Sequence, residues 1–142
     1  MSRVSNMELK EHAEFIEGVI ATYTNRPEYA VYSGTATAGQ ATNHEVFTVP
    51  EGAKYILRAV LASIDTTVTD TAVSVYVDID PYTFILVPDG ANEADRQSGS
   101  TVARWSGWLY LPSGATVRVK VNNPDTADHS VRVLLALEEV KW

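Results

Sequence analysis

The chain has 142 residues, of which 45% are hydrophobic and 20% are charged, a composition typical of one soluble globular domain with a full hydrophobic core. It contains no cysteine, which excludes disulfides and thiolate metal sites. The net charge of −7 argues against a nucleic-acid partner, and no apolar stretch approaches the roughly 20 residues that a membrane helix needs. The first stretch also lacks the basic start and apolar run of a signal peptide.

Residues 1–27 predict a helical arm that differs from the rest of the chain. Ser5 and Glu8 fit a capping box, in which the two residues satisfy backbone donors at the start of a helix. Apolar residues then recur at the spacing of an amphipathic helix of about four turns, which ends before Pro27. Either this helix packs across an open end of the following domain, or it docks on a neighbouring subunit. Its apolar residues are candidate partner-binding residues: Leu9, Phe15, Ile16, Val19 and Ile20.

Residues 28–142 predict a single β domain. Tyr29 to Ser33 predicts a short strand, and the Thr-, Ala- and Gly-rich stretch from Gly34 to Asn43 is expected to be flexible. The segment from Ala53 to Asp65 alternates Tyr55, Leu57, Ala59 and Leu61 with a second, largely apolar set. This pattern predicts a central strand that is buried on both faces over part of its length.

The clearest alternation in the chain lies between Thr71 and Asp80. Its aliphatic side chains are expected to face the core, and the polar ones between them to face water or a partner. Residues 89–100 predict a polar loop without apolar periodicity. Further strands are predicted at Tyr82 to Val87, Thr101 to Leu111, Ala115 to Val121 and Ser130 to Val140.

Three turns have nearly the same sequence: Val49-Pro50-Glu51-Gly52, Val87-Pro88-Asp89-Gly90 and Leu111-Pro112-Ser113-Gly114. Proline at the second turn position and glycine at a position with positive φ are typical of type II turns. The turns and the strands together predict an all-β fold, an antiparallel β-sandwich of about eight strands with an N-terminal amphipathic α-helix. A jelly roll is the most economical form of such a sandwich, and an immunoglobulin-like strand order remains possible.

No pattern predicts a catalytic, cofactor-binding or metal-binding residue. Asp78 and Asp80 lie on an exposed strand face, but they lack the spaced ligands and central glycine of a calcium loop. The three histidines are isolated in the sequence and are expected at a surface or an interface. Ser98, between Gly99 and Gln97, has no nucleophile-elbow motif around it.

The tryptophans are the remaining candidate partner-binding residues. Trp105 and Trp108 are three apart on one predicted strand, so their side chains should project from opposite faces, one into the core and one outward. Trp142 ends the chain after an apolar strand. An exposed tryptophan is either an anchor in a protein interface or a stacking platform for a sugar.

Segments after the predicted arm resemble small structural proteins of tailed bacteriophages, above all the capsid decoration (cement) proteins of the jelly-roll type. The resemblance covers about Thr48 to Val140 and rests on Phe47 to Gly52 before a long strand, on Leu109 to Val119, and on the closing stretch from Asn123 to Glu139. It implies a non-enzymatic protein that binds the outer surface of a capsid and stabilises the lattice. The implied partners are the major capsid protein and one or two further copies of the chain, in a dimer or trimer. The implied location is the capsid surface of a virion assembled in the host cytoplasm.

A sandwich with an exposed Trp105 or Trp108 beside the Asp89 to Gln97 loop could instead bind a carbohydrate or receptor as part of a head or tail fibre.

Overall fold

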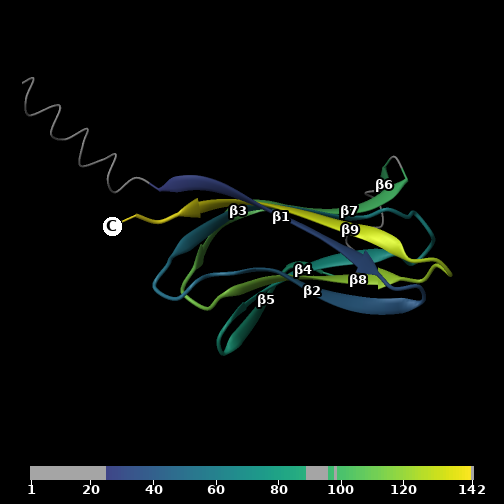
Figure 1. Ribbon diagram of the computed structural model, residues 1–142, viewed down its shortest axis with the longest axis horizontal. Coiled ribbons are helices and arrows are strands. Elements are labelled where there is room, and N and C mark those ends of the chain that lie inside the picture. The colour runs from purple at the N-terminus through teal and green to yellow at the C-terminus, as the bar shows by residue number, and fades with distance from the viewer. Residues whose placement is uncertain (1–24, 89–95, 98, 142) are drawn as a thin grey trace, which may run out of the picture.

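The computed structural model describes residues 25–88, 96–97 and 99–141, and the predicted helix lies outside them. In this part of the chain, nine strands form two antiparallel sheets packed face to face (Figure 1). Sheet A has the order β1-β9-β3-β7-β6, and sheet B has the order β2-β8-β4-β5. The strands are β1 (Arg26–Ala36), β2 (Gln40–Thr48), β3 (Tyr55–Ile64), β4 (Ala72–Ile79), β5 (Tyr82–Val87), β6 (Arg96–Gln97), β7 (Ser100–Leu111), β8 (Thr116–Asn123) and β9 (His129–Glu139).

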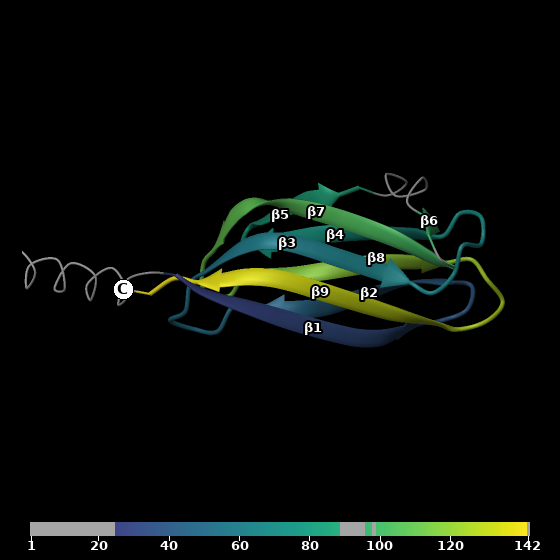
Figure 2. The ribbon, with the colours of Figure 1, turned by 90° about the horizontal axis from the view of Figure 1, so that it is seen from above.

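The strand order brings distant parts of the chain together. In sheet A the first strand, β1, pairs with the last, β9, and the two lie side by side with β3 and β7 (Figure 2). In sheet B, β8 pairs with both β2 and β4. The predicted all-β sandwich with two antiparallel sheets is therefore confirmed, and the described residues contain no helix that could cross a membrane.

The core between the sheets consists mainly of valine and leucine. Alternating residues of β4, β8 and β9 point inward and are almost fully buried, as the sequence predicts. Complete burial of one such side chain stabilises the fold by about 1.5–3 kcal/mol. These inward residues are Val73, Val75 and Val77 of β4, Val117, Val119 and Val121 of β8, and Val131, Val133, Leu135 and Leu137 of β9.

Strand β3 departs from strict alternation. A β-bulge lies between Leu57 and Ala59, so Val60 takes the inward position that alternation gives to Ala59. Arg58 and Ala59 consequently share the outer side of sheet A. The predicted face made of Tyr55, Leu57, Ala59 and Leu61 is wrong beyond Leu57, because a bulge changes the parity of the strand.

The stretch predicted to be flexible belongs largely to strands. Gly34 to Ala36 pairs with β9, and Gln40 to Asn43 pairs with β8. The buried amide of Asn123 donates a hydrogen bond to the carbonyl of Ala36 at 3.0 Å, which fixes the end of β1. Pairing with distant strands stabilises this stretch, although six of its ten residues are Gly, Ala or Asn, which are depleted in strands.

The first and third proline-containing turns lie against one another. Gly114 donates its backbone N–H to Val49, and Gly52 donates to the Ser113 hydroxyl, both at 3.0 Å. Gly52 and Gly114 have positive φ, as predicted. In each turn, the backbone N–H of the residue after glycine donates a hydrogen bond to the carbonyl of the proline. Pro50 and Pro112 therefore occupy the first turn position instead of the predicted second.

Candidate protein-binding surfaces

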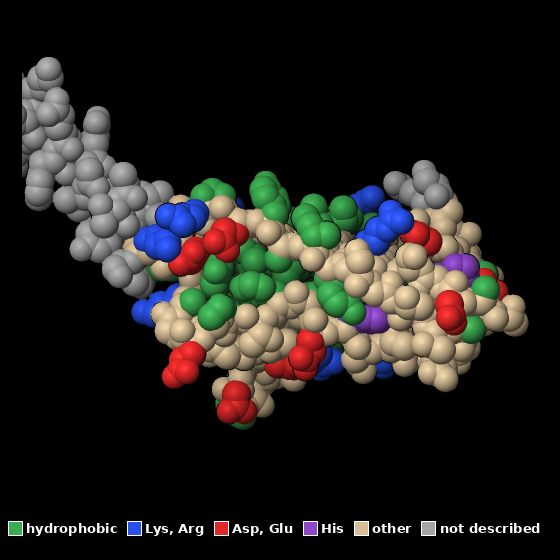
Figure 3. All heavy atoms as spheres, viewed as in Figure 1, with side chains coloured by type: hydrophobic (Ala, Val, Ile, Leu, Met, Phe, Trp, Pro, Cys, Tyr) green, Lys and Arg blue, Asp and Glu red, His purple; other side chains and the backbone are tan. Residues whose placement is uncertain are grey.

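The outer face of sheet A carries an exposed apolar surface over three adjacent strands. Val31 of β1, Leu134 of β9 and Leu61 of β3 are paired partners and form one continuous row across the sheet. All three are exposed, Val31 to 76%. Figure 3 shows hydrophobic side chains standing along the top of the molecule, above sheet A. Contiguous exposed apolar side chains of this kind make the face a candidate interaction site.

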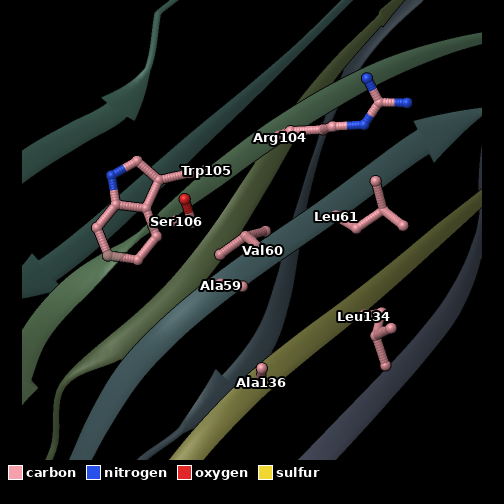
Figure 4. Close-up of a pocket in the computed structure, with 8 residues that line it drawn as sticks. All are labelled: Ala59, Val60, Leu61, Arg104, Trp105, Ser106, Leu134 and Ala136. Carbon is pink, nitrogen blue, oxygen red and sulfur yellow. The ribbon is translucent and has the colours of Figure 1, made fainter.

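A groove crosses this face beside that row. Its floor is a second row of paired residues with small side chains, Ala136, Ala59 and Ser106. Leu61 and Leu134, with Arg104 beyond them, form one wall (Figure 4). The hollow over this floor has a volume of about 400 Å³. A second hollow of about 270 Å³ shares Ala136 and extends the groove to Tyr29 on β1, which is 75% exposed.

The opposite wall is held by the bulged Arg58. Its Nη1 donates to Glu138 Oε1 at 3.1 Å, and its Nε donates to the Gly107 carbonyl at 3.1 Å. Arg58 therefore ties β3 to both of its neighbours on the outer face. Asn25, the first described residue, donates its Nδ2 to the other Glu138 oxygen at 3.1 Å. The N-terminal segment thus joins the sandwich at this wall.

The two tryptophans of β7 lie on opposite faces, as predicted. Trp105 pairs with the inward Val60 and packs half-buried against the core, over Gly107. Trp108 points outward and is 63% exposed. Trp108 lies seven residues along β7 from Thr101, the partner of Arg96, a separation of about 20 Å.

The β4–β5 hairpin carries the second exposed apolar surface. It projects from the sandwich on the side of sheet B (Figure 1). Tyr82 and Phe84 pair with Ile79 and Val77 and so lie on the inward side of the sheet, yet both are exposed. Ile85 is exposed on the other side. We name Tyr82, Phe84 and Ile85 the hairpin patch.

One edge of strand β5 pairs with no other strand in the described part of the chain. Of the three longer edge strands in the described part of the chain, β1 contains Arg26, Pro27 and Glu28, and β2 contains Glu45, while β5 has neither charge nor proline between Tyr82 and Val87. Charges and prolines on edge strands prevent pairing with other chains. Strand β5 lacks this protection and has an edge suited to a protein partner.

The polar candidates take part in structural contacts. Arg118 donates to both oxygens of Asp78 and lies over the Tyr76 ring, and its hydrogen bonds hold the pKa of Asp78 below its ordinary value. A hydrogen bond from His129 at 2.6 Å likewise lowers the pKa of Asp125. Among the described residues, no cluster of three or more His, Asp or Glu side chains is arranged to hold a metal ion.

His44 differs from the surface or interface histidine that we expected. It is buried between β1 and β2, with Tyr32 Oη at 2.8 Å from Nδ1 and Thr42 Oγ1 at 2.8 Å from Nε2. Burial lowers its pKa. His44 is buried because it pairs with Val119, whose side chain points inward. The residues around His44 in the sequence do not indicate this pairing.

Six of the eight candidate partner-binding residues lie outside the described part of the chain: Leu9, Phe15, Ile16, Val19, Ile20 and Trp142. The structure adds the hairpin patch and the groove, neither of which the sequence predicts. The alternation of small and large outward residues on β3 and β9 is the one signal that could have indicated the groove.

No family model matches the sequence, and no curated protein matches it. Among solved structures, the chain is similar to a protein of the cyanophage Pam1 capsid asymmetric unit, with 23% identity and a TM-score of 0.45 over 81% of this chain and 84% of that one. A pentameric capsid protein from metagenomic phage sequences has 18% identity and a TM-score of 0.38, and the match covers 76% of this chain and 61% of that one. Dimeric latent PorU from Porphyromonas gingivalis has 8% identity and a TM-score of 0.26, and the match covers 84% of this chain and 14% of that one. Likeness at this level does not assign a function.

Proposed function

We propose that the protein is a non-enzymatic structural component of a phage virion that binds the outer surface of the capsid and stabilises its lattice. The hairpin patch carries this proposal. It combines three exposed large apolar side chains with an uncharged strand edge that pairs with no other described strand. Such an edge offers main-chain hydrogen bonds to a partner strand, and the side chains on both of its faces supply apolar contact area.

The strand order supports the jelly-roll form of the sandwich. Strands β1-β9-β3-β7 oppose β2-β8-β4-β5, and only β4–β5 among the longer consecutive strands forms a hairpin within one sheet. The resemblance of the turn and strand sequences to decoration proteins agrees with this form. The proposed partner is the major capsid protein, bound by a dimer or trimer of the chain. The proposed location is the outer surface of the virion, after assembly in the host cytoplasm.

Stabilisation of a lattice requires only that the protein binds the assembled particle more tightly than the free subunits. Symmetry repeats each contact over the particle, so contacts of modest individual strength give high avidity when one oligomer engages several subunits. The acidic net charge keeps such a protein soluble at the concentrations that assembly needs.

Co-sedimentation with capsids tests the proposal. The major capsid protein encoded in the same genome is expressed without this chain, and its shells are mixed with the purified full-length protein on a density gradient. We expect the chain to migrate with the shells and to raise their temperature of disassembly. Shells that remain free of the chain at micromolar concentration would contradict the proposal, as would a genome that encodes no capsid protein.

Exposed Trp108 favours the alternative function, a carbohydrate- or receptor-binding module. Tyr110 is exposed on the same outer face of β7 and extends the aromatic surface. Trp108 lies about 20 Å along β7 from the β6 pairing, which separates it from the described end of the polar loop that was expected to assist it. Quenching of tryptophan fluorescence by oligosaccharides that disappears in Trp108→Ala would support sugar binding.

A further inference from the structure

The groove on the outer face of sheet A has small residues where its neighbours have large ones. Ala136, Ala59 and Ser106 form the floor, and Leu61 and Leu134 stand above it on one side. We propose that the N-terminal segment of the same molecule fills this groove, with the apolar side of its predicted helix against the floor.

The place where the segment joins the sandwich supports this assignment. Asn25 is bonded to Glu138, which lies in the wall of the groove. Pro27 is paired with Glu138 inside β1, so the chain is already held in the sheet at this residue. Any change of direction must occur before Asn25. The segment of 24 residues is therefore attached, through its C-terminal end, beside the groove that we assign to it.

The dimensions of the helix and the groove agree. From Ile20 to Leu9 the apolar stripe of a helix is about 16 Å long, at 1.5 Å per residue. From β1 to β7 the groove crosses three strand spacings, about 14 Å. The five steps from Ile20 to Asn25 span at most about 17 Å, while the Tyr29 row lies about 13 Å from Asn25 along β1. The helix can therefore lie across the strands, with Ile20 near β1 and Leu9 near β7.

The side chains also complement one another. In this placement the apolar stripe of Leu9, Ala13, Ile16 and Ile20 meets the small side chains of the floor and the leucines of the wall. The segment carries four glutamates against only Arg3 and Lys10. Arg104 lies in the leucine wall, and Arg132 is exposed on β9 next to Leu134 along the outer face. Arg132 is paired with Asp65 at 3.6 Å, so Arg104 is the cation that supports this placement, because its charge is opposite to the net charge of the segment.

Connection within one chain favours the same molecule over a second copy. A short connection holds the segment near its own groove at an effective concentration in the millimolar range, which is far above ordinary protein concentrations. A second copy competes only when geometry prevents docking within the molecule, and the distances above permit it.

Engineered cysteines test the placement, because the chain has none of its own. With Ile20 placed near β1, residue 13 lies about 10 Å further along the helix, the distance that separates β1 from β3. We therefore combine Ala13→Cys with Ala59→Cys in the full-length protein. Both changes are small, so the variant should fold as the unmodified protein does. On mild oxidation we expect a disulfide within the chain, seen as a faster-migrating monomer band on a denaturing gel that dithiothreitol reverses.

The matched control combines Glu11→Cys with Ala59→Cys, because residue 11 lies on the side of the helix away from the stripe. We expect disulfide formation at least about tenfold slower in this control, since its side chain points away from the floor. Leu134→Asp in the Ala13→Cys, Ala59→Cys background should also slow the reaction.

Equal rates in the two cysteine pairs, or no disulfide in either, would overturn the proposal. A disulfide-linked dimer as the main product would assign the groove to the segment of a second copy and would overturn it too. The experiment uses free protein without capsids, so its outcome is independent of the proposed function.

Discussion

His44 is a buried histidine whose two ring nitrogens both have hydroxyl partners, Tyr32 and Thr42. Burial disfavours the charged imidazolium and lowers the pKa of His44 below its ordinary value of 6.5. The unfolded chain therefore binds a proton at a pH where the folded protein does not. The stability that His44 contributes is complete above about pH 6.5 and is lost as the pH falls toward the folded-state pKa.

We predict that His44→Gln flattens this dependence. Between pH 7.5 and 5, the free energy of unfolding measured in urea should decrease more steeply for the unmodified protein than for the variant, because only the unmodified protein has a histidine with a lowered pKa at this position. At pH 7.5 the variant should be less stable than the unmodified protein, and its free energy of unfolding should change less with pH. An equal slope in the two proteins would show that other groups cause the dependence.

Gly107 lies beneath the Trp105 ring. A Cβ at this position would lie 2.8 Å from a ring carbon, so a side chain there forces the indole to move. We predict that Gly107→Ala destabilises the fold by about 1–3 kcal/mol, the range for overpacking, and shifts tryptophan emission to longer wavelength. The neighbouring residue Ser106 is exposed and serves as the control. The unfolding free energy of Ser106→Ala should remain within about 0.5 kcal/mol of that of the unmodified protein. Denaturant unfolding followed by fluorescence measures both quantities.

At the scale of elements, the two joined turns hold one end of the sandwich. Gly114 has a φ of 84°, a region that side chains with a Cβ avoid. We predict that Gly114→Ala costs about 1–2 kcal/mol of unfolding free energy and that Gly114→Asn costs less, because asparagine tolerates this conformation. Thermal unfolding of the two variants measures the difference. Equal losses of unfolding free energy in the two variants would show that the loss comes from a disturbed contact with Val49 and not from the positive φ.

The hairpin patch is the element on which the proposed function depends. We predict that Ile85→Lys lowers the affinity for capsid shells at least about tenfold, because it places a charge in an apolar contact. It should leave the unfolding free energy within about 0.5 kcal/mol, since Ile85 is exposed. Thr69→Lys adds the same charge to an exposed loop at the other end of β4 and should bind normally. Normal binding by Ile85→Lys would remove β5 from the contact.

The sequence predicted those elements in which local pattern and final burial agree. The alternating valines of β4 and β8 and the opposite orientations of Trp105 and Trp108 are examples. Prediction failed where a distant strand determines the outcome. Pairing with β9 and β8 orders the stretch from Gly34 to Asn43, and the bulge at Arg58 reverses the faces of β3.

The hairpin patch illustrates the same difficulty for the site. Tyr82 to Val87 has the composition of a buried strand, and nothing local indicates that the hairpin projects from the sandwich. Likewise, the small residues of the groove floor belong to three strands, and only the register of β9, β3 and β7 brings them into one row.

At the scale of the whole molecule, the sandwich separates two surfaces. The groove lies on the outer face of sheet A, beside the point where the N-terminal segment joins β1. The hairpin patch projects from sheet B (Figure 1). If the first surface binds the protein's own segment and the second binds the capsid, docking of the segment does not obstruct binding to the lattice.

Electron cryomicroscopy of capsid shells incubated with the full-length protein tests the central claim most directly. We expect sandwich-shaped density outside the shell, repeated by the symmetry of the shell, with the β4–β5 hairpin toward the capsid subunits. Undecorated shells, or density in which the hairpin faces solvent, would contradict it.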